Sequence, residues 1–62
     1  MINRSQFCEA QARRGYEVEN LGLVTILRHI DHHGMLYTAL WFWNEDGSLN
    51  QHMEPTWSVT PA

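Results

Sequence analysis

Four histidines and one cysteine are the nitrogen and sulfur ligands that this sequence offers to a metal ion. His29, His32 and His33 lie close together, whereas His52 and Cys8 stand far from them in the chain. Zinc sites combine histidine with cysteine or carboxylate at recurrent spacings, and this pattern lacks such a complete ligand set. We therefore expect no metal and no cofactor, with His29, His32 and His33 as weak metal candidates.

The remaining polar residues do not form a recognisable catalytic group. Cys8 could act as a nucleophile beside a histidine, but on a short amphipathic helix a cysteine is usually a small core residue. The acidic residues fall mostly in expected loops and turns, where such residues commonly serve the turn itself. The sequence contains no glycine-rich phosphate loop and no nucleophile elbow. We expect the chain not to be an enzyme.

The elements that would position these side chains begin with a helix over residues 3–14. Asn3 is a preferred N-cap residue, and Gln6 follows it at capping-box spacing. Gly15 suits the C-terminal end of the helix because it can adopt a left-handed conformation. A helix of about three turns must pack on another element to be stable.

The rest of the chain predicts a three-stranded antiparallel meander in a single domain over residues 1–62. We expect strands at residues 23–30, 35–43 and 48–53, and a C-terminal tail at residues 55–62, because β-branched and aromatic runs alternate with turn residues. The turns end in Gly34 and Gly47, which suits glycine bulges. The predicted fold class is α+β, in the order α-β-β-β.

Alternation of side chains then gives the sheet two apolar faces. With a bulge in each turn, Asp31 opposes Met35 and Asn44 opposes Ser48. We expect the helix to cover the more aliphatic face, which carries Val24, Ile26, Arg28, Ile30, Leu36, Thr38, Leu40 and Phe42. A two-residue first turn would instead move residues 23–30 by one position and exchange their faces.

The second, aromatic face is the predicted binding surface, because exposed apolar patches of this extent usually mark interaction sites. We expect its contact residues to be Leu23, Leu27, Tyr37, Trp41, Trp43, Leu49 and Met53. Its simplest partner is another copy of the chain, forming a homodimer, and a host protein is the other candidate. In the alternative arrangement, residues 16–22 and the tail around Trp57 fold over this face.

Composition limits the other partners. The chain has 62 residues, a net charge of −3 and four basic residues, all of them arginine. A single-strand nucleic-acid-binding module using the aromatic face is the alternative function, although such modules normally carry several basic contacts. The longest apolar run is far below the about 20 residues of a membrane-spanning helix. A lone thiol and no visible signal peptide predict a cytoplasmic protein.

Two segments resemble a known group of proteins: INRSQF at residues 2–7 and MLYTALWFWNEDGSLN at residues 35–50. Together they are similar to the small accessory proteins of phages, prophages and plasmids, which are often helix-plus-meander folds. Some members of that group inhibit host proteins, including anti-CRISPR proteins and phage inhibitors of host polymerase. The resemblance implies a non-enzymatic, protein-binding accessory protein that inhibits a host complex. It identifies no functional residue.

Overall fold

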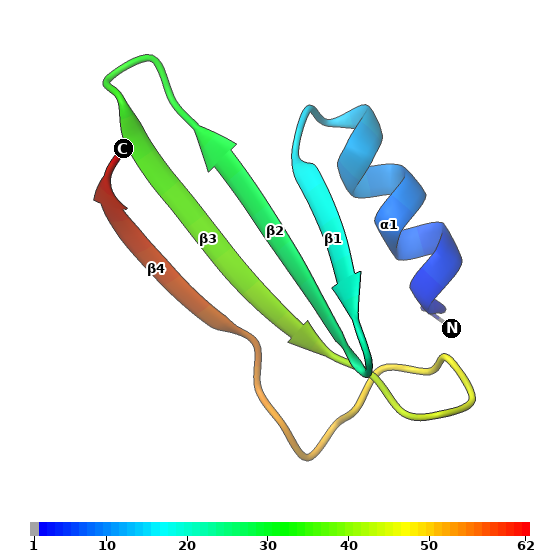
Figure 1. The fold of residues 1–62 in the computed structure, drawn as a ribbon. Helices are drawn as coiled ribbons and strands as arrows, with labels where there is room; N and C mark the ends of the chain where they lie inside the picture. The colour runs from blue at the N-terminus through cyan, green and yellow to red at the C-terminus, as the bar shows by residue number, and fades with distance from the viewer. Residues whose placement is uncertain (1) are drawn as a thin grey trace.

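A computed structural model describes residues 2–62 as one helix followed by four antiparallel strands. The elements are α1 (Arg4–Arg13), β1 (Glu17–Leu21), β2 (Val24–Ile30), β3 (Met35–Phe42) and β4 (Thr56–Pro61). The strands lie side by side in the order in which they occur in the chain (Figure 1). The predicted α+β class is therefore confirmed. Within residues 2–62, no helix is long and apolar enough to cross a bilayer.

Helix α1 begins where the capping residues predict. The Oδ1 atom of Asn3 accepts a hydrogen bond from the backbone N–H of Gln6 at 2.9 Å, which satisfies one of the free donors of the first turn. At the other end, Gly15 has a φ of +95° and its N–H donates to the Ala12 carbonyl. Both ends of the helix are therefore set by local sequence.

The two predicted glycine turns set the register of the meander as expected. The N–H of Asp31 donates to the Met35 carbonyl at 3.0 Å, and Gly34 has a φ of +77°. In the second turn, the N–H of Asn44 donates to the Ser48 carbonyl at 2.8 Å. Ile30 consequently opposes Leu36, and the side chains of β2 and β3 divide between two faces as the alternation predicts.

The prediction of three strands is wrong, because the sheet has four. Residues 17–21, which lie outside every predicted strand, pair with β2, and the expected tail supplies β4, which pairs with β3. The predicted strand at residues 48–53 is reduced to isolated bridges, including one between Trp43 and Leu49, followed by a turn. This segment curls under the end of the sheet, so that β4 takes the place beside β3 (Figure 1).

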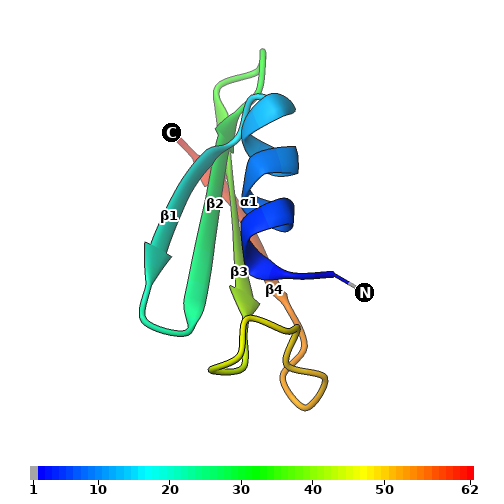
Figure 2. The same cartoon turned by 90° about the vertical axis from the view of Figure 1, so that its right-hand side faces the viewer.

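The helix packs on the aromatic face, and the prediction that it covers the aliphatic face is wrong. The Phe7 ring lies 4.8 Å from the ring of Trp41 and 5.2 Å from that of Trp43, measured between centroids. Viewed from the side, α1 lies on one side of the sheet, and the strands form the second layer (Figure 2). Aromatic rings fill more of the space beneath a short helix than branched aliphatic side chains do.

Candidate functional site

The core beneath α1 is organised around a fully buried threonine. Thr25 has no exposed surface, and its hydroxyl accepts a hydrogen bond from Trp43 Nε1 at 2.8 Å. The same hydroxyl donates to Asn20 Oδ1 at 2.6 Å. A buried polar group needs such partners because an unpaired one costs about 1–3 kcal/mol. The hydroxyl of Thr25 thus connects three strand segments, and sequence reasoning did not identify its role.

Arg4 connects the start of the helix to this core. Its guanidinium donates to Asn20 Oδ1 at 3.0 Å, to the Gly22 carbonyl at 2.6 Å and to the Val24 carbonyl at 3.0 Å. The planar fork of arginine donors suits several fixed acceptors at once. Arg4 therefore holds the turn between β1 and β2 against the first turn of α1, which is a structural role.

The two tryptophans beneath the helix differ in how their N–H groups are satisfied. Trp43 is 1% exposed and donates to Thr25, whereas Nε1 of Trp41 is buried with no hydrogen-bond partner among the described residues. The Trp41 ring also lies 6.3 Å from the ring of Trp57 on β4, in an edge-on arrangement. Trp41 thus links the part of the face under α1 to the part that α1 leaves open.

The seven residues predicted to form one binding surface are not brought together as such a surface. Leu27 and Trp43 are buried on the α1 side of the sheet, and Trp41 packs against Phe7. The others lie in the turn before β2, at the far end of β3 and in the loop before β4: Leu23, Tyr37, Leu49 and Met53. Because Leu27 and Trp43 are buried, a partner cannot contact all seven at once.

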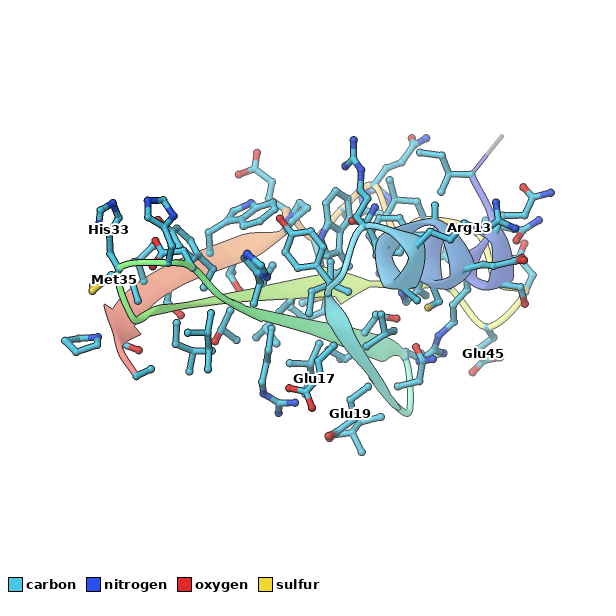
Figure 3. The ribbon with its side chains drawn as sticks, turned by 90° about the horizontal axis from the view of Figure 1, so that it is seen from above. Arg13, Glu17, Glu19, His33, Met35 and Glu45 are labelled. Atoms are coloured by element: carbon cyan, nitrogen blue, oxygen red, sulfur yellow. The ribbon has the colours of Figure 1, made fainter. Side chains whose placement is uncertain are left out.

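The histidines lie at separate places in the fold. The ring of His29 lies 5.3 Å from that of Tyr16, while His32 and His33 lie 3.9 Å from each other at the tip of the β2–β3 hairpin (Figure 3 labels His33). His52 is in the loop before β4. Among residues 2–62, no three histidine, cysteine, aspartate or glutamate side chains are arranged to hold a metal ion.

The carboxylates with shifted pKa values serve the two glycine turns. The backbone N–H of Met35, followed by that of His33, donates to Asp31 and keeps the pKa of this carboxyl below its ordinary value of 3.8. The hydroxyl and then the N–H of Ser48 lower the pKa of Asp46 in the same way. Hydrogen bonds to the charged form explain both shifts, and both carboxylates act as turn-stabilising groups.

The side of the sheet away from α1, which we name the open face, carries apolar side chains that the helix does not cover, of which Leu21 and Ile30 are exposed and the others half-buried. Its central strands contribute branched aliphatic residues and one aromatic ring. By the strand register it consists of Leu21, Val24, Ile26, Ile30, Leu36, Leu40 and Phe42. A solvated antiparallel face is normally polar. The apolar character of this face therefore indicates a contact surface.

Polar residues border the open face differently on its two sides. Glu17 and Glu19 point away from α1 along β1 (Figure 3), and Arg28 lies beside them with Nη1 3.5 Å from Glu19 Oε1. On β4 the same face carries only hydroxyl groups, those of Thr56, Ser58 and Thr60. Two carboxylates against one guanidinium leave the β1 border with a net negative charge, while the β4 border is neutral.

A groove lies on the α1 side, between the helix and β4. It has a volume of about 260 Å³, and its walls include Phe7, Arg14 and Tyr16 on one side and Leu27, Trp41 and Trp57 on the other. The groove exists because α1 stops short of β4, where Trp57 is 63% exposed.

The chain was compared with protein-family models, with curated proteins and with solved structures. None of the three comparisons produced a match.

Proposed function

We propose that this chain is a non-enzymatic protein-binding domain whose contact surface is the open face. The observation that carries the proposal is the apolar side chains of β2 and β3 on the side of the sheet opposite α1. Contiguous apolar surface of this kind is a common mark of protein–protein contact. The binding surface is thus the face that the sequence had suggested for the helix.

The borders of the open face favour a particular kind of partner. Glu17 and Glu19 outnumber Arg28 at the β1 border, so the approaching surface gains from a basic side chain there. We therefore propose a host protein that presents an apolar surface flanked by lysine or arginine. The exposed Arg28–Glu19 pair contributes little to folding by itself, which leaves both side chains free to exchange partners on binding.

The resemblance to accessory proteins of phages, prophages and plasmids suggests in which biological process this binding takes place. In that setting the chain inhibits a host complex, in the manner of an anti-CRISPR protein, and works in the cytoplasm, where its single thiol remains reduced. This part of the proposal rests on the similarity of residues 2–7 and 35–50 to that group. A likeness of this kind indicates a role only by analogy.

The test compares capture of host proteins by three forms of the chain. Ile26→Lys places a charge in the middle of the open face, whereas Leu23→Lys places the same charge in the exposed turn before β2. We expect the original chain to capture a host protein. Its affinity for that protein should fall at least tenfold with Ile26→Lys, as for a contact at the centre of an interface. The affinity should be unchanged with Leu23→Lys.

A second variant tests the charge of the border. Glu17→Lys should weaken binding of the same protein, with an effect that shrinks as salt is raised. If every captured protein binds Ile26→Lys as tightly as the original chain, the open face is not the contact surface.

Single-strand nucleic-acid binding is the alternative function, and the exposed rings of Tyr37 and Trp57 are the observation that favours it. Stacking on these rings would need phosphate contacts to add affinity, and the net charge of −3 opposes them. Retention on single strands at low salt, lost on Trp57→Ala, would support this alternative.

A further inference from the structure

The two outer strands of the sheet differ in how their free edges are protected. Glu17 and Glu19 place charges on β1, and helix α1 lies next to that strand. Within the described residues 2–62, no strand or helix lies beyond the outer edge of β4 (Figure 1), and all six residues of Thr56–Pro61 are exposed and uncharged. Natural proteins commonly blunt free edges with charges or a covering element, because an unprotected edge pairs with other strands.

The register shows which backbone groups of β4 face outward. The N–H of Ala62 donates to the Gly34 carbonyl at 2.9 Å, so this pair of residues is hydrogen-bonded across the two strands. Pairs along an antiparallel ladder alternate between bonded and non-bonded. Thr60, Ser58 and Thr56 therefore turn their backbone groups toward β3, and the backbone N–H and C=O of Val59 and Trp57 face the open edge.

Two prolines bracket this free edge symmetrically. Pro61 shares the outward orientation of Trp57 and Val59, and Pro55 directly precedes the strand, so that each proline lies three residues from Ser58. Proline has no N–H, so neither can donate to a strand added at this edge. The donors available to an incoming strand are therefore those of Trp57 and Val59, placed one residue on each side of Ser58.

We propose that β4 pairs with β4 of a second copy of this chain, in an antiparallel register with Ser58 opposite Ser58. In this register Trp57 of each copy faces Val59 of the other. The backbone N–H and C=O of both residues are then paired in each copy, which gives four hydrogen bonds between the two strands. Moving the centre to Trp57 or to Val59 sets a proline opposite Val59 or Trp57, so only one pair of residues keeps both of its hydrogen bonds. The centred register instead sets the prolines opposite each other, outside two complete pairs. The symmetry of the segment around Ser58 is what identifies a second copy as the partner.

The resulting dimer has one continuous sheet of eight strands with both helices on the same side. The side chains of Trp57 and Val59, which are 63% and 51% exposed, contact each other across the new pair and cover part of the groove beside α1. We expect one strand of six residues in each copy to bury less than the about 1,200 Å² of stable interfaces. We therefore expect a weak dimer that dissociates on dilution. Pairing along β4 leaves the apolar residues of the open face free, so the dimer does not depend on the proposed function.

Cysteine cross-linking tests the register directly. In the centred pair, the two Ser58 residues form a non-hydrogen-bonded pair with Cα atoms about 4.5 Å apart, which is within reach of a disulfide. With Cys8→Ser as background, Ser58→Cys should form a disulfide-linked dimer on mild oxidation. Thr60→Cys should not, because it faces Thr56 of the second copy. Mixing Thr56→Cys with Thr60→Cys chains should restore the cross-link.

A backbone variant tests the role of the edge without cysteine. Val59→Pro removes an outward N–H that β3 does not use, while Val59→Ala keeps that N–H and shortens the side chain. Sedimentation over a dilution series should show the dissociation constant rising at least tenfold with Val59→Pro and much less with Val59→Ala. A chain that is monomeric at every concentration, or equal cross-linking of Ser58→Cys and Thr60→Cys, overturns the proposal whatever the open face binds.

Discussion

The two faces of the sheet are both apolar, but only the face under α1 contains buried polar side chains that hydrogen-bond to one another. On the α1 side, the Thr25 hydroxyl joins Trp43 to Asn20, and Arg4 binds the same asparagine. On the open face, the one side-chain pair between strands among residues 2–62 is the exposed contact of Arg28 with Glu19. Hydrophobicity alone did not decide which face the helix covers. The two faces differ because the polar groups of Asn20, Thr25 and Trp43 can be buried only when they hydrogen-bond to one another, and they do so on the α1 side.

The largest expected difference between the faces comes from two adjacent aromatic residues. Trp43 is 1% exposed beneath α1, and Phe42 lies half-buried on the open face. We expect Trp43→Ala to lower the free energy of unfolding by about 3–5 kcal/mol, and Phe42→Ala to lower it by about 1–2 kcal/mol. Because a chain of this size has about 3–5 kcal/mol in total, Trp43→Ala should be largely unfolded by circular dichroism at 25 °C. Equal losses for both variants would remove the distinction between the faces.

A smaller effect should come from the buried hydroxyl. Thr25→Val keeps the shape of the side chain but leaves the Trp43 N–H without an acceptor, at an expected cost of about 2 kcal/mol in urea unfolding. Thr38→Val makes the same change on the open face and should alter stability by no more than about 0.5 kcal/mol. If both threonine variants unfold at the same urea concentration, the polar network beneath α1 does not stabilise the fold.

The smallest effect concerns the turns, which belong to neither face. Asp31 and Asp46 have pKa values below 3.8 in the folded chain, so their contribution is fully present above the unfolded value. It should be lost as the pH falls below 3.8 through the folded pKa, because protonation then favours the unfolded chain. The free energy of unfolding, measured between pH 6 and pH 2, should therefore depend less on pH in the double variant Asp31→Asn/Asp46→Asn than in the original chain. An unchanged pH profile in the double variant would contradict the assignment.

The local features of the fold could be predicted because short segments determine them. Asn3 begins the helix, and the glycines at positions 34 and 47 set the turns and hence the register of β2 and β3. The division of side chains into two faces followed directly from that register. These features depend on contacts within a few residues, where sequence patterns are most informative.

The outer strands and the position of the helix depend on distant contacts and were not predicted. Residues 17–21 alternate charged with apolar or polar side chains, and residues 56–61 alternate hydroxyl with apolar ones, which in retrospect is a strand signal in both cases. Prolines at both ends of the second segment hid that signal. The choice of face depended on Arg4, Asn20, Thr25 and Trp43, which meet only in the folded chain. Two of the seven predicted contact residues, Leu27 and Trp43, are therefore buried.

The contacts of Arg4 also have a consequence for the order of events during synthesis. Its N–H donates to the carbonyl of Gly47, and its side chain binds the carbonyls of Gly22 and Val24. A ten-residue helix is barely stable alone, so α1 lacks its full set of contacts until residue 47 has been made. At about 5–20 residues per second, that delay lasts on the order of seconds. Helix α1 is therefore translated before the groups that hold it, and it reaches its final place only after β1, β2 and β3 have been made.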